Sequence, residues 1–253
     1  MKQTALITGA TAGIGKATAE LLAKQGWNLI LTGRRLERLE ALKSSLQSTY
    51  SIDVDLLHFD IRDYDSCEQA WNSLSDGTKN QIAVLVNNAG LASGRAPIDE
   101  GNVEDWDIMI DTNVKGLLYM TRLVVPVMRE NQRGHIVNIA SIAGKEVYQN
   151  GNVYCASKHA VDALSRSMRI DLLPYNIKVT NIAPGAAETE FSLVRLKGDE
   201  DAAKAVYDGF EPLTAEDIAE TVWFALNRPA HVNINDLVIV PTAQANVTNL
   251  VRK

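Results

Sequence analysis

Seven short apolar runs, each bounded by turn residues, recur along the chain. Their length and composition predict buried β-strands at Thr4–Thr8, Asn28–Thr32, Val54–Phe59, Ile82–Asn87, His135–Ile139, Ile177–Ile182 and Asp236–Val240. Helical periodicity fills most of the intervals, at Ile14–Gln25, Leu36–Thr49, Ser66–Leu74, Val103–Arg129, Val153–Leu173 and Ala215–Asn227. This alternation predicts parallel strands joined by right-handed crossovers. The expected fold class is α/β, a doubly wound, Rossmann-like sheet of seven parallel strands with helices on both faces.

The regular pattern runs through the chain without a repeat, a low-complexity stretch or a flexible linker. With 253 residues and 46% hydrophobic content, residues 1–253 are expected to form a single domain with a substantial core. Residues 186–209 are the exception, because this stretch is charged, weakly patterned and long for a connection. It follows the sixth predicted strand, so we expect it to cover the substrate.

The overall charge narrows the classes of partner. A formal net charge of −6 without a basic block repels phosphate backbones and argues against nucleic acid. No apolar run approaches the ~20 residues that span a bilayer, and the first predicted strand starts too early to leave room for a signal peptide. The two cysteines, Cys67 and Cys155, lie far apart without ligand spacing, which fits a reducing compartment. We expect a cytoplasmic protein that does not bind membranes.

A glycine-rich turn follows the first predicted strand, in Thr8-Gly9-Ala10-Thr11-Ala12-Gly13-Ile14-Gly15. Glycines at a strand-to-helix turn let bare backbone approach a pyrophosphate at the start of the helix. Glycines also permit tight turns and close packing of a helix on a sheet without any ligand. The turn therefore indicates a nucleotide site and leaves a purely structural role open.

Arg34 and Arg35 follow the second predicted strand, where an acidic side chain would contact the ribose 2′-hydroxyl of NAD. Guanidinium groups offer forked donors to a 2′-phosphate, so the pair favours NADP over NAD. The alternative is that both are solvated charges at a helix start. Asp60, after the third strand, has oxygens that could accept from an adenine amino group, or it is a turn or cap residue.

The fourth predicted strand ends in Asn87-Asn88-Ala89-Gly90. Its small residues would allow an adenosine ribose to approach, and its asparagines could instead tie neighbouring strands together. The sequence leaves both roles open.

Tyr154 and Lys158 are four residues apart on one face of a predicted helix. A cation ~4 Å from the phenol, at an effective dielectric of ~20, contributes roughly 4 kcal/mol, or about three pKa units. This lowering would bring the tyrosine pKa near neutrality, where the phenol can exchange a proton with an alcohol or carbonyl oxygen. Ser141, just beyond the fifth strand, could hydrogen-bond the same oxygen. A tyrosine and a lysine at this spacing are also common on ordinary amphipathic helices.

Together these motifs resemble the short-chain dehydrogenase/reductase family over essentially the whole chain. The matching residues are Thr8-Gly9-xxx-Gly13-x-Gly15, Asn87-Asn88-Ala89-Gly90, Asn113, Ser141, Tyr154-xxx-Lys158 and Pro184-Gly185. The resemblance implies that Ser141 orients the substrate and that Tyr154 is the acid/base. It also implies that Lys158 lowers the tyrosine pKa and holds the nicotinamide ribose, and that Asn113 anchors a proton-relay water.

The cofactor implied by the resemblance and the arginines is NADP, as NADP⁺ or NADPH. The residues expected to contact it are Gly9, Thr11, Gly13, Ile14, Gly15, Arg34, Arg35, Asp60, Ile61, Asn87, Ala89, Gly90, Tyr154, Lys158, Pro184, Gly185 and Thr189. No metal is expected, because His58, His135, His159 and His231 show no ligand pattern.

Within the family, Glu190–Asp199 and Pro229–Asn235 resemble the NADP-dependent 3-hydroxy acid dehydrogenases, a group that includes serine and L-allo-threonine dehydrogenases and malonic semialdehyde reductases. The resemblance implies interconversion of a short 3-hydroxy acid with its 3-oxo acid or semialdehyde. A carboxylate substrate needs a cation, and Arg195 is the first candidate, followed by Arg95 and Lys145. The alternative for each is a solvated surface charge.

Two other functions remain open. One is a reductase of the same family that acts on another carbonyl compound, such as a ketone, a sugar or a 3-oxoacyl group. The other is a non-catalytic NADP-binding sensor, against which the complete set Asn113, Ser141, Tyr154 and Lys158 argues. The resemblance also implies a homotetramer built through the segments Val103–Arg129 and Val153–Leu173, although a long apolar helix face is equally explained by packing on the sheet.

Overall fold

The computed structural model describes residues 3–253; Met1 and Lys2, at the start of the predicted domain, lie outside the described residues. Within that range a seven-stranded sheet has the order β3-β2-β1-β4-β5-β6-β7, and every neighbouring pair is parallel. The strands are β1 (Thr4–Ile7), β2 (Asn28–Gly33), β3 (Val54–His58), β4 (Ile82–Asn87), β5 (Gly134–Ile139), β6 (Ile177–Pro184) and β7 (Asp236–Ile239). The predicted doubly wound α/β fold is confirmed.

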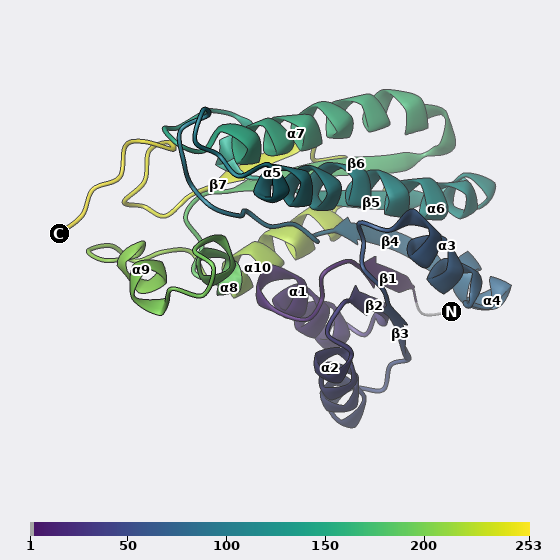
Figure 1. Cartoon of the computed structure of the whole chain (residues 1–253). Helices are drawn as coiled ribbons and strands as arrows, with labels where there is room; N and C mark the ends of the chain where they lie inside the picture. Colours follow the sequence, from purple (N-terminus) through teal and green to yellow (C-terminus); the bar gives the residue numbers. More distant parts are fainter. Residues whose placement is uncertain (1–2) are drawn as a thin grey trace.

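Helices cover both faces of the sheet (Figure 1). One face carries α1 (Gly13–Lys24), α2 (Leu36–Thr49) and α10 (Ala215–Leu226). The other carries α3 (Tyr64–Asn72), α4 (Asp76–Asn80), α5 (Val103–Ile110), α6 (Gly116–Glu130) and α7 (Asn152–Leu172). Two short helices, α8 (Glu190–Arg195) and α9 (Glu200–Ala205), lie beyond β6. The strands form the middle of the core, and β4 is buried along its whole length.

The structure departs from the predicted elements in one divided helix and in three additional short helices. A π-helical turn, Asp111–Lys115, divides the helix expected at Val103–Arg129. The sequence pattern did not indicate it, because a single π turn inside a longer helix leaves the residues on either side at helical spacing. The helices α4, α8 and α9 have only five or six residues each, too few for a period to be recognised. Side-chain caps start all three, from Ser75, Thr189 and Asp199.

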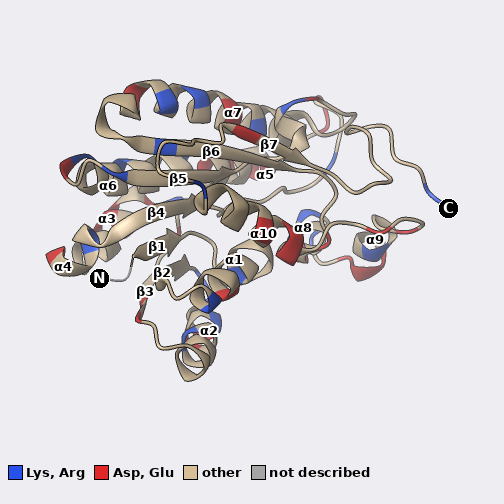
Figure 2. Ribbon diagram, turned by 180° about the vertical axis from the view of Figure 1, so that it is seen from behind, with Lys and Arg blue, Asp and Glu red and all other residues tan. Residues whose placement is uncertain are grey.

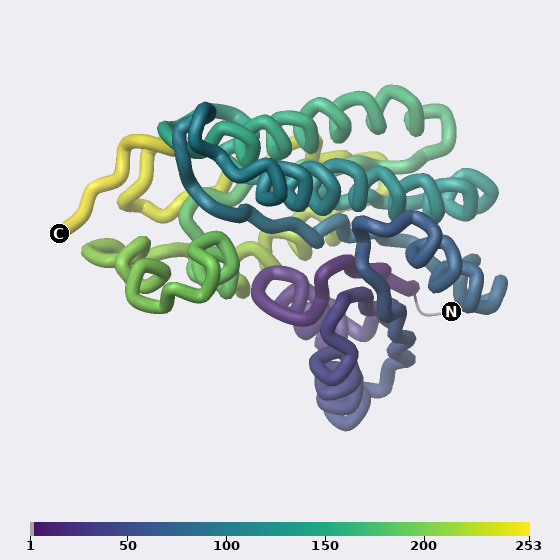
Figure 3. The backbone as a smooth tube through the Cα atoms, viewed as in Figure 1, coloured from purple at the N-terminus to yellow at the C-terminus, as the bar shows by residue number. Residues whose placement is uncertain are grey.

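The segment after β6 and the C-terminal segment lie side by side at one end of the molecule (Figure 3). The backbone N–H of Lys253 donates to the Gly209 carbonyl at 2.8 Å. The Arg252 guanidinium reaches the Val206 carbonyl at 3.0 Å. These contacts fix the far end of residues 186–209, the stretch expected to cover the substrate; that role stays a prediction.

The surface mixes both signs of charge. Figure 2 shows Lys/Arg and Asp/Glu positions interspersed along α7. Among residues 3–253, no helix combines the length and the apolar content needed to cross a membrane.

Ile170 and Leu173, at the end of α7, are 74% and 75% exposed. Such side chains suit a contact between copies, but the homotetramer stays a prediction.

Candidate active site

The carboxyl ends of the strands open onto a cavity of about 580 Å³, a volume within the range of small-molecule sites. It is lined by residues that follow β1 to β6, by much of the stretch 186–207 and by Gln244 and Val247. The predicted site residues in its wall are Gly9, Thr11, Gly13, Ile14, Arg34, Arg35, Asp60, Ile61, Ala89, Gly90, Ser141, Tyr154, Lys158, Pro184, Gly185, Thr189 and Arg195. The fold therefore brings most of the predicted set together.

The glycine turn presents bare backbone to the cavity. Gly9 has φ +67°, and a Cβ there would lie 2.9 Å from the Ala89 Cα, so the turns after β1 and β4 approach too closely for a side chain. Thr8 locks the two turns together, because its Oγ1 accepts from the backbone N–H groups of Asn88 and Ala89 at 3.0 and 2.9 Å. Gly13, at φ +49°, faces Thr189 across the cavity mouth, where a Cβ would lie 3.3 Å from the threonine Cβ.

Two residues of the predicted cofactor set lie outside the cavity wall. A Cβ on Gly15 would clash with the Asn88 amide and the Gly9 carbonyl, so this glycine serves close packing of α1. Asn87 is buried, and its Nδ2 donates to Thr121 Oγ1 and Asn138 Oδ1 at 3.0 Å each. Of the two roles that the sequence left open, Asn87 therefore takes the one that ties neighbouring strands.

The two arginines after β2 lie at the cavity mouth and are largely exposed. Arg35 donates through Nε and Nη2 to Thr11 Oγ1, at 3.1 and 2.7 Å. Asp60 also lines the cavity, but the Arg62 guanidinium holds both carboxylate oxygens at 2.6–3.0 Å. Hydrogen bonds from Arg62 are the main reason that the pKa of Asp60 is lowered. This ion pair competes with the expected adenine contact.

Tyr154 lies in the first turn of α7 with its ring buried, 5.5 Å from the ring of Phe191 in α8. Ser141, directly after β5, lies close enough to the tyrosine hydroxyl to affect its pKa. Its Oγ donates to the Pro184 carbonyl at 3.4 Å and accepts from the Ala143 N–H at 3.1 Å. Burial raises the pKa of Tyr154, and Ser141 and the Arg195 charge only partly oppose it. The expected pKa near neutrality is wrong for this structure, because desolvation outweighs the nearby charges.

Lys158 lies one helical turn after Tyr154, buried in the cavity wall. Its Nζ donates to the Ile139 carbonyl at 2.9 Å, which holds the ammonium at the end of β5. Burial lowers the pKa of Lys158 to about 8. Gly90 lies opposite, where a Cβ would be 3.4 Å from the Lys158 Nζ and 3.2 Å from the Asn113 Oδ1. A side chain at this position would fill the space beside the ammonium.

The buried lysine predicts a pH dependence of stability. Between pH 8 and about 10.5 the unfolded chain keeps the Lys158 proton that the folded chain has lost, so the free energy of unfolding rises with pH. Relative to Lys158→Met, the wild type should gain roughly 3 kcal/mol across this window, from ~1.4 kcal/mol per pKa unit. Urea denaturation from pH 7 to 10.5 measures it, with the exposed Lys16→Met as the control. Equal slopes in wild type and Lys158→Met would contradict the assignment.

Asn113 lies in the π-helical turn, buried behind the cavity wall. Its Oδ1 accepts from the Leu91 N–H at 2.8 Å, and its Nδ2 donates to the Leu91 carbonyl at 2.8 Å and to Ser157 Oγ at 2.9 Å. The side chain therefore clamps the loop after β4 to α7. The expected anchoring of a relay water by Asn113 stays a prediction.

Arg195, the last residue of α8, reaches the cavity next to Tyr154. The guanidinium carbon lies 5.6 Å from the Tyr154 ring centre and 5.5 Å from that of Tyr148. Its Nε is buried and has no hydrogen-bond partner among the described residues. Arg95 approaches the other side of the arrangement, 5.9 Å from the Tyr148 ring centre. An unpaired buried guanidinium N–H beside the phenol is suited to an anionic group of a substrate.

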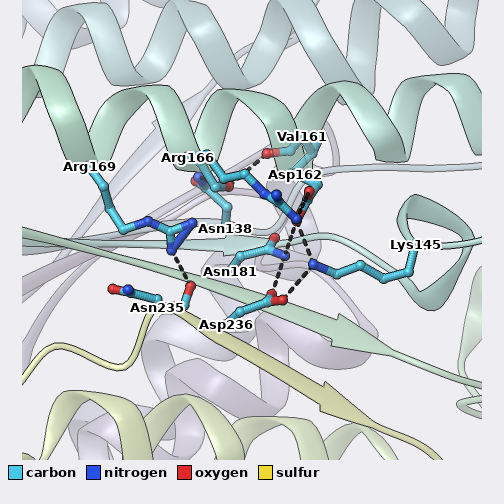
Figure 4. A network of polar contacts seen from close by, with 10 residues as sticks. Asn138, Lys145, Val161, Asp162, Arg166, Arg169, Asn181, Asn235 and Asp236 are labelled. Carbon is cyan, nitrogen blue, oxygen red and sulfur yellow. Dashed lines mark hydrogen bonds and ion pairs between the residues drawn. The ribbon is translucent and has the colours of Figure 1, made fainter.

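Lys145, the third predicted cation, is not available to a substrate in the cavity. Its Nζ lies 2.5 Å from both Asp162 Oδ1 of α7 and Asp236 Oδ2 of β7 (Figure 4). Asn181 donates to the same two aspartates. The lysine thus joins the loop after β5 to α7 and to the edge strand, and its candidacy as a carboxylate ligand is wrong.

Three residues of the cavity wall were not indicated by the sequence pattern: Tyr148, Phe191 and Gln244. The aromatic rings flank Tyr154 and Arg195, and the Gln244 Oε1 accepts from the Ala186 N–H at 2.9 Å, beside the cavity. None of them belongs to a periodic pattern or to a spaced pair. Tertiary packing alone places them.

Residues 3–253 contain no group of three or more His, Cys, Asp or Glu side chains that is arranged to hold a metal ion. His135 is bonded to Thr180 Oγ1 at 2.8 Å, and His159 to the Cys155 carbonyl at 2.9 Å. Both rings have roles within the fold.

Comparison with known proteins agrees with this geometry. The chain is 47% identical to the NADP-dependent 3-hydroxy acid dehydrogenase YdfG of Salmonella typhimurium, over 95% of each chain. It is 46% identical to a sulfoacetaldehyde reductase of Chromohalobacter salexigens, over 97% of this chain and 96% of that protein. The solved structure of the closed form of serine dehydrogenase complexed with NADP⁺ matches with a TM-score of 0.93 and 44% identity, covering 99% of this chain and 100% of the other.

Residues 3–198 match the family model described as short chain dehydrogenase. The match includes the glycine turn, the ends of β4 and β5, and the helix that carries Tyr154 and Lys158. The family predicted from the motifs is confirmed: the chain belongs to the short-chain dehydrogenase family, and it is an oxidoreductase of the kind that acts on CH–OH groups.

Proposed function

We propose that this protein is an NADP(H)-dependent oxidoreductase that interconverts a short 3-hydroxy acid and its 3-oxo acid or semialdehyde. The observation that carries the proposal is the buried, unpartnered Nε of Arg195 beside Tyr154. A buried donor without a partner costs free energy, and an anionic substrate would supply the partner at the place where the phenol can reach its oxygen.

The residues at the nucleotide end fit a dinucleotide with a 2′-phosphate. Gly9 and Gly13 line the cavity at turns where a Cβ would meet Ala89 or Thr189, and their bare backbone would face the pyrophosphate. Arg34 and Arg35 supply forked donors at the end of β2, where NAD-specific sites carry an acid. The YdfG relative is named as NADP-dependent, and the serine dehydrogenase structure contains NADP⁺, which supports the same cofactor here.

When bound, NADP(H) supplies or accepts the hydride at the reacting carbon. Tyr154 exchanges the proton of the substrate oxygen, and Ser141 orients that oxygen by a hydrogen bond. Burial raises the pKa of Tyr154, which favours the phenol over the phenolate, so in the reductive direction the phenol would donate its proton to the carbonyl oxygen. The Lys158 ammonium lies in the same wall, where it would hold the nicotinamide ribose.

The acid group of the substrate has two candidate chemistries. A guanidinium binds a carboxylate or a sulfonate by the same charge-assisted hydrogen bonds, so Arg195 alone does not select between them. The sulfoacetaldehyde reductase relative makes a short sulfonated aldehyde the second candidate. An uncharged ketone, the remaining enzymatic alternative, leaves the Arg195 Nε without a partner.

A substrate panel tests the proposal. NADPH oxidation is followed with malonic semialdehyde, sulfoacetaldehyde and an uncharged ketone, and NADP⁺ or NAD⁺ reduction with L-serine, L-allo-threonine and 3-hydroxypropionate. We expect turnover of the carboxylates with NADP(H), and a kcat/KM at least tenfold higher than for the ketone. Higher kcat/KM for sulfoacetaldehyde would move the assignment to the sulfonate, and turnover of the ketone alone would overturn the acid site. Tight NADPH binding without any turnover would favour a sensor.

A further inference from the structure

Glu190, the first residue of α8, joins the segment after β6 to the start of α2. Its Oε2 lies 2.8 Å from Arg35 Nη1, and its Oε1 lies 2.7 Å from Arg38 Nη1. Both carboxylate oxygens are therefore used by guanidinium groups of α2 and the residue that precedes it. The two hydrogen bonds from these arginines lower the pKa of Glu190 despite its partial burial.

The Arg35 guanidinium is shared between three segments. One edge, through Nε and Nη2, is bonded to Thr11 Oγ1 in the glycine turn. The remaining Nη1 is the one that Glu190 occupies. Thr11, Arg35 and Glu190 all line the cavity at its nucleotide end, together with Arg34. The carboxylate thus lies on the cation that the proposed function assigns to the 2′-phosphate.

A carboxylate and a phosphate compete for such a cation. Both bind guanidinium through oxygen atoms that accept forked N–H donors, and two like charges on one guanidinium repel each other. A phosphate monoester carries about −1.5 to −2 charges at neutral pH, more than a carboxylate. The three side chains are 41–49% exposed, and ion pairs with that exposure are weak enough to be exchanged.

We propose that Glu190 is an internal competitor of the cofactor's 2′-phosphate and thereby a determinant of cofactor specificity. Without the phosphate, Glu190 holds the start of α8 against Arg35; the phosphate displaces it and loosens α8 from α2. NAD, which lacks this phosphate, leaves the Glu190 pair in place. The inference rests on the proposed NADP dependence and on the assignment of Arg35 to the 2′-phosphate.

Binding measurements on Glu190→Gln test the competition. The amide keeps the size of the side chain and removes its charge, so NADP⁺ should bind about threefold to fivefold more tightly, the gain expected of a partly exposed pair, whereas the Kd for NAD⁺ stays unchanged. Titration calorimetry gives both constants. Glu37→Gln is the matched control, an exposed acid in the first turn of α2. An equal gain in Glu37→Gln, or unchanged or weaker NADP⁺ binding in Glu190→Gln, would overturn the inference.

Hydrogen exchange tests the release of α8 without the nicotinamide. Adenosine 2′,5′-bisphosphate should raise amide exchange in residues 190–195 of the wild type, and AMP, which lacks the 2′-phosphate, should not. In Glu190→Gln the exchange should be high with either probe. Equal exchange with both probes in the wild type would overturn the displacement.

Arg35→Gln separates this inference from the cofactor assignment. If Arg35 binds the 2′-phosphate, the variant loses NADP⁺ affinity and keeps NAD⁺ affinity. If NADP⁺ affinity does not fall, the assignment of Arg35 fails, and the Glu190 proposal fails with it. If NADP⁺ affinity falls but Glu190→Gln matches the wild type, only the role of Glu190 is rejected.

Discussion

Replacing Tyr154 with phenylalanine should lower kcat about 10²–10⁴-fold, the usual contribution of general acid–base catalysis. The aromatic ring at this position, in the first turn of α7, would still pack against Phe191 of α8, so the cavity keeps its shape. Only the hydroxyl that Ser141 contacts would be lost. Steady-state assays with NADPH and the best substrate of the panel give kcat. The Kd for NADPH should change by less than about twofold, because the bulk of the proposed cofactor contacts lies elsewhere in the cavity.

Tyr148→Phe is the matched control for this variant. Tyr148 lines the same cavity and lies against Arg195, but it has no proposed role in proton transfer. Loss of the Tyr148 hydroxyl should change kcat by less than about tenfold relative to the wild type, a smaller effect than the loss of general acid–base catalysis. If Tyr154→Phe retained more than a tenth of the wild-type kcat, Tyr154 would not be the acid. A kcat loss in Tyr148→Phe as large as that in Tyr154→Phe would have the same meaning.

The fold was predictable because the central parallel strands are buried on both faces and are therefore largely apolar. β4 has the predicted bounds, Ile82–Asn87, and its side chains are all buried. β6 continues two residues beyond its predicted end, to Pro184, because it pairs there with β7. The π-helical turn at Asp111–Lys115 could not be predicted from the sequence pattern, since it changes the backbone hydrogen bonds without interrupting the apolar period.

The site was predictable where it depends on strand ends and local spacing. The topology brings the turns after β1 and β4 together, and one helical turn separates Tyr154 from Lys158. Electrostatics was not predictable from spacing. The Lys158 ammonium is held by the Ile139 carbonyl, and the burial of Tyr154 dominates its pKa. Lys145 is neutralised by Asp236, 91 residues further along the chain. Such partners follow from the packed structure alone.

Replacing Arg195 with alanine should lower kcat/KM for an acidic substrate by roughly 10- to 150-fold, which corresponds to a charge-assisted hydrogen bond of about 1.5–3 kcal/mol. Its Nε has no partner among the described residues, and an anionic group of the substrate would be the partner whose loss the variant measures. The change should appear mainly in KM. Lys197→Gln is the matched control, because it removes a cation two residues away that is paired with Asp105 at 2.9 Å.

An uncharged ketone separates the two ways in which Arg195 acts on the site. The arginine charge also lowers the pKa of Tyr154, so its removal raises that pKa further. This effect would reach every substrate and would displace the pH profile of kcat, whereas loss of the anion contact is confined to acids. We expect the ketone to keep its kcat/KM within about threefold in Arg195→Ala, a difference below 1 kcal/mol. Equal losses for ketone and acid would assign Arg195 to the proton transfer and leave the acid group without its proposed ligand.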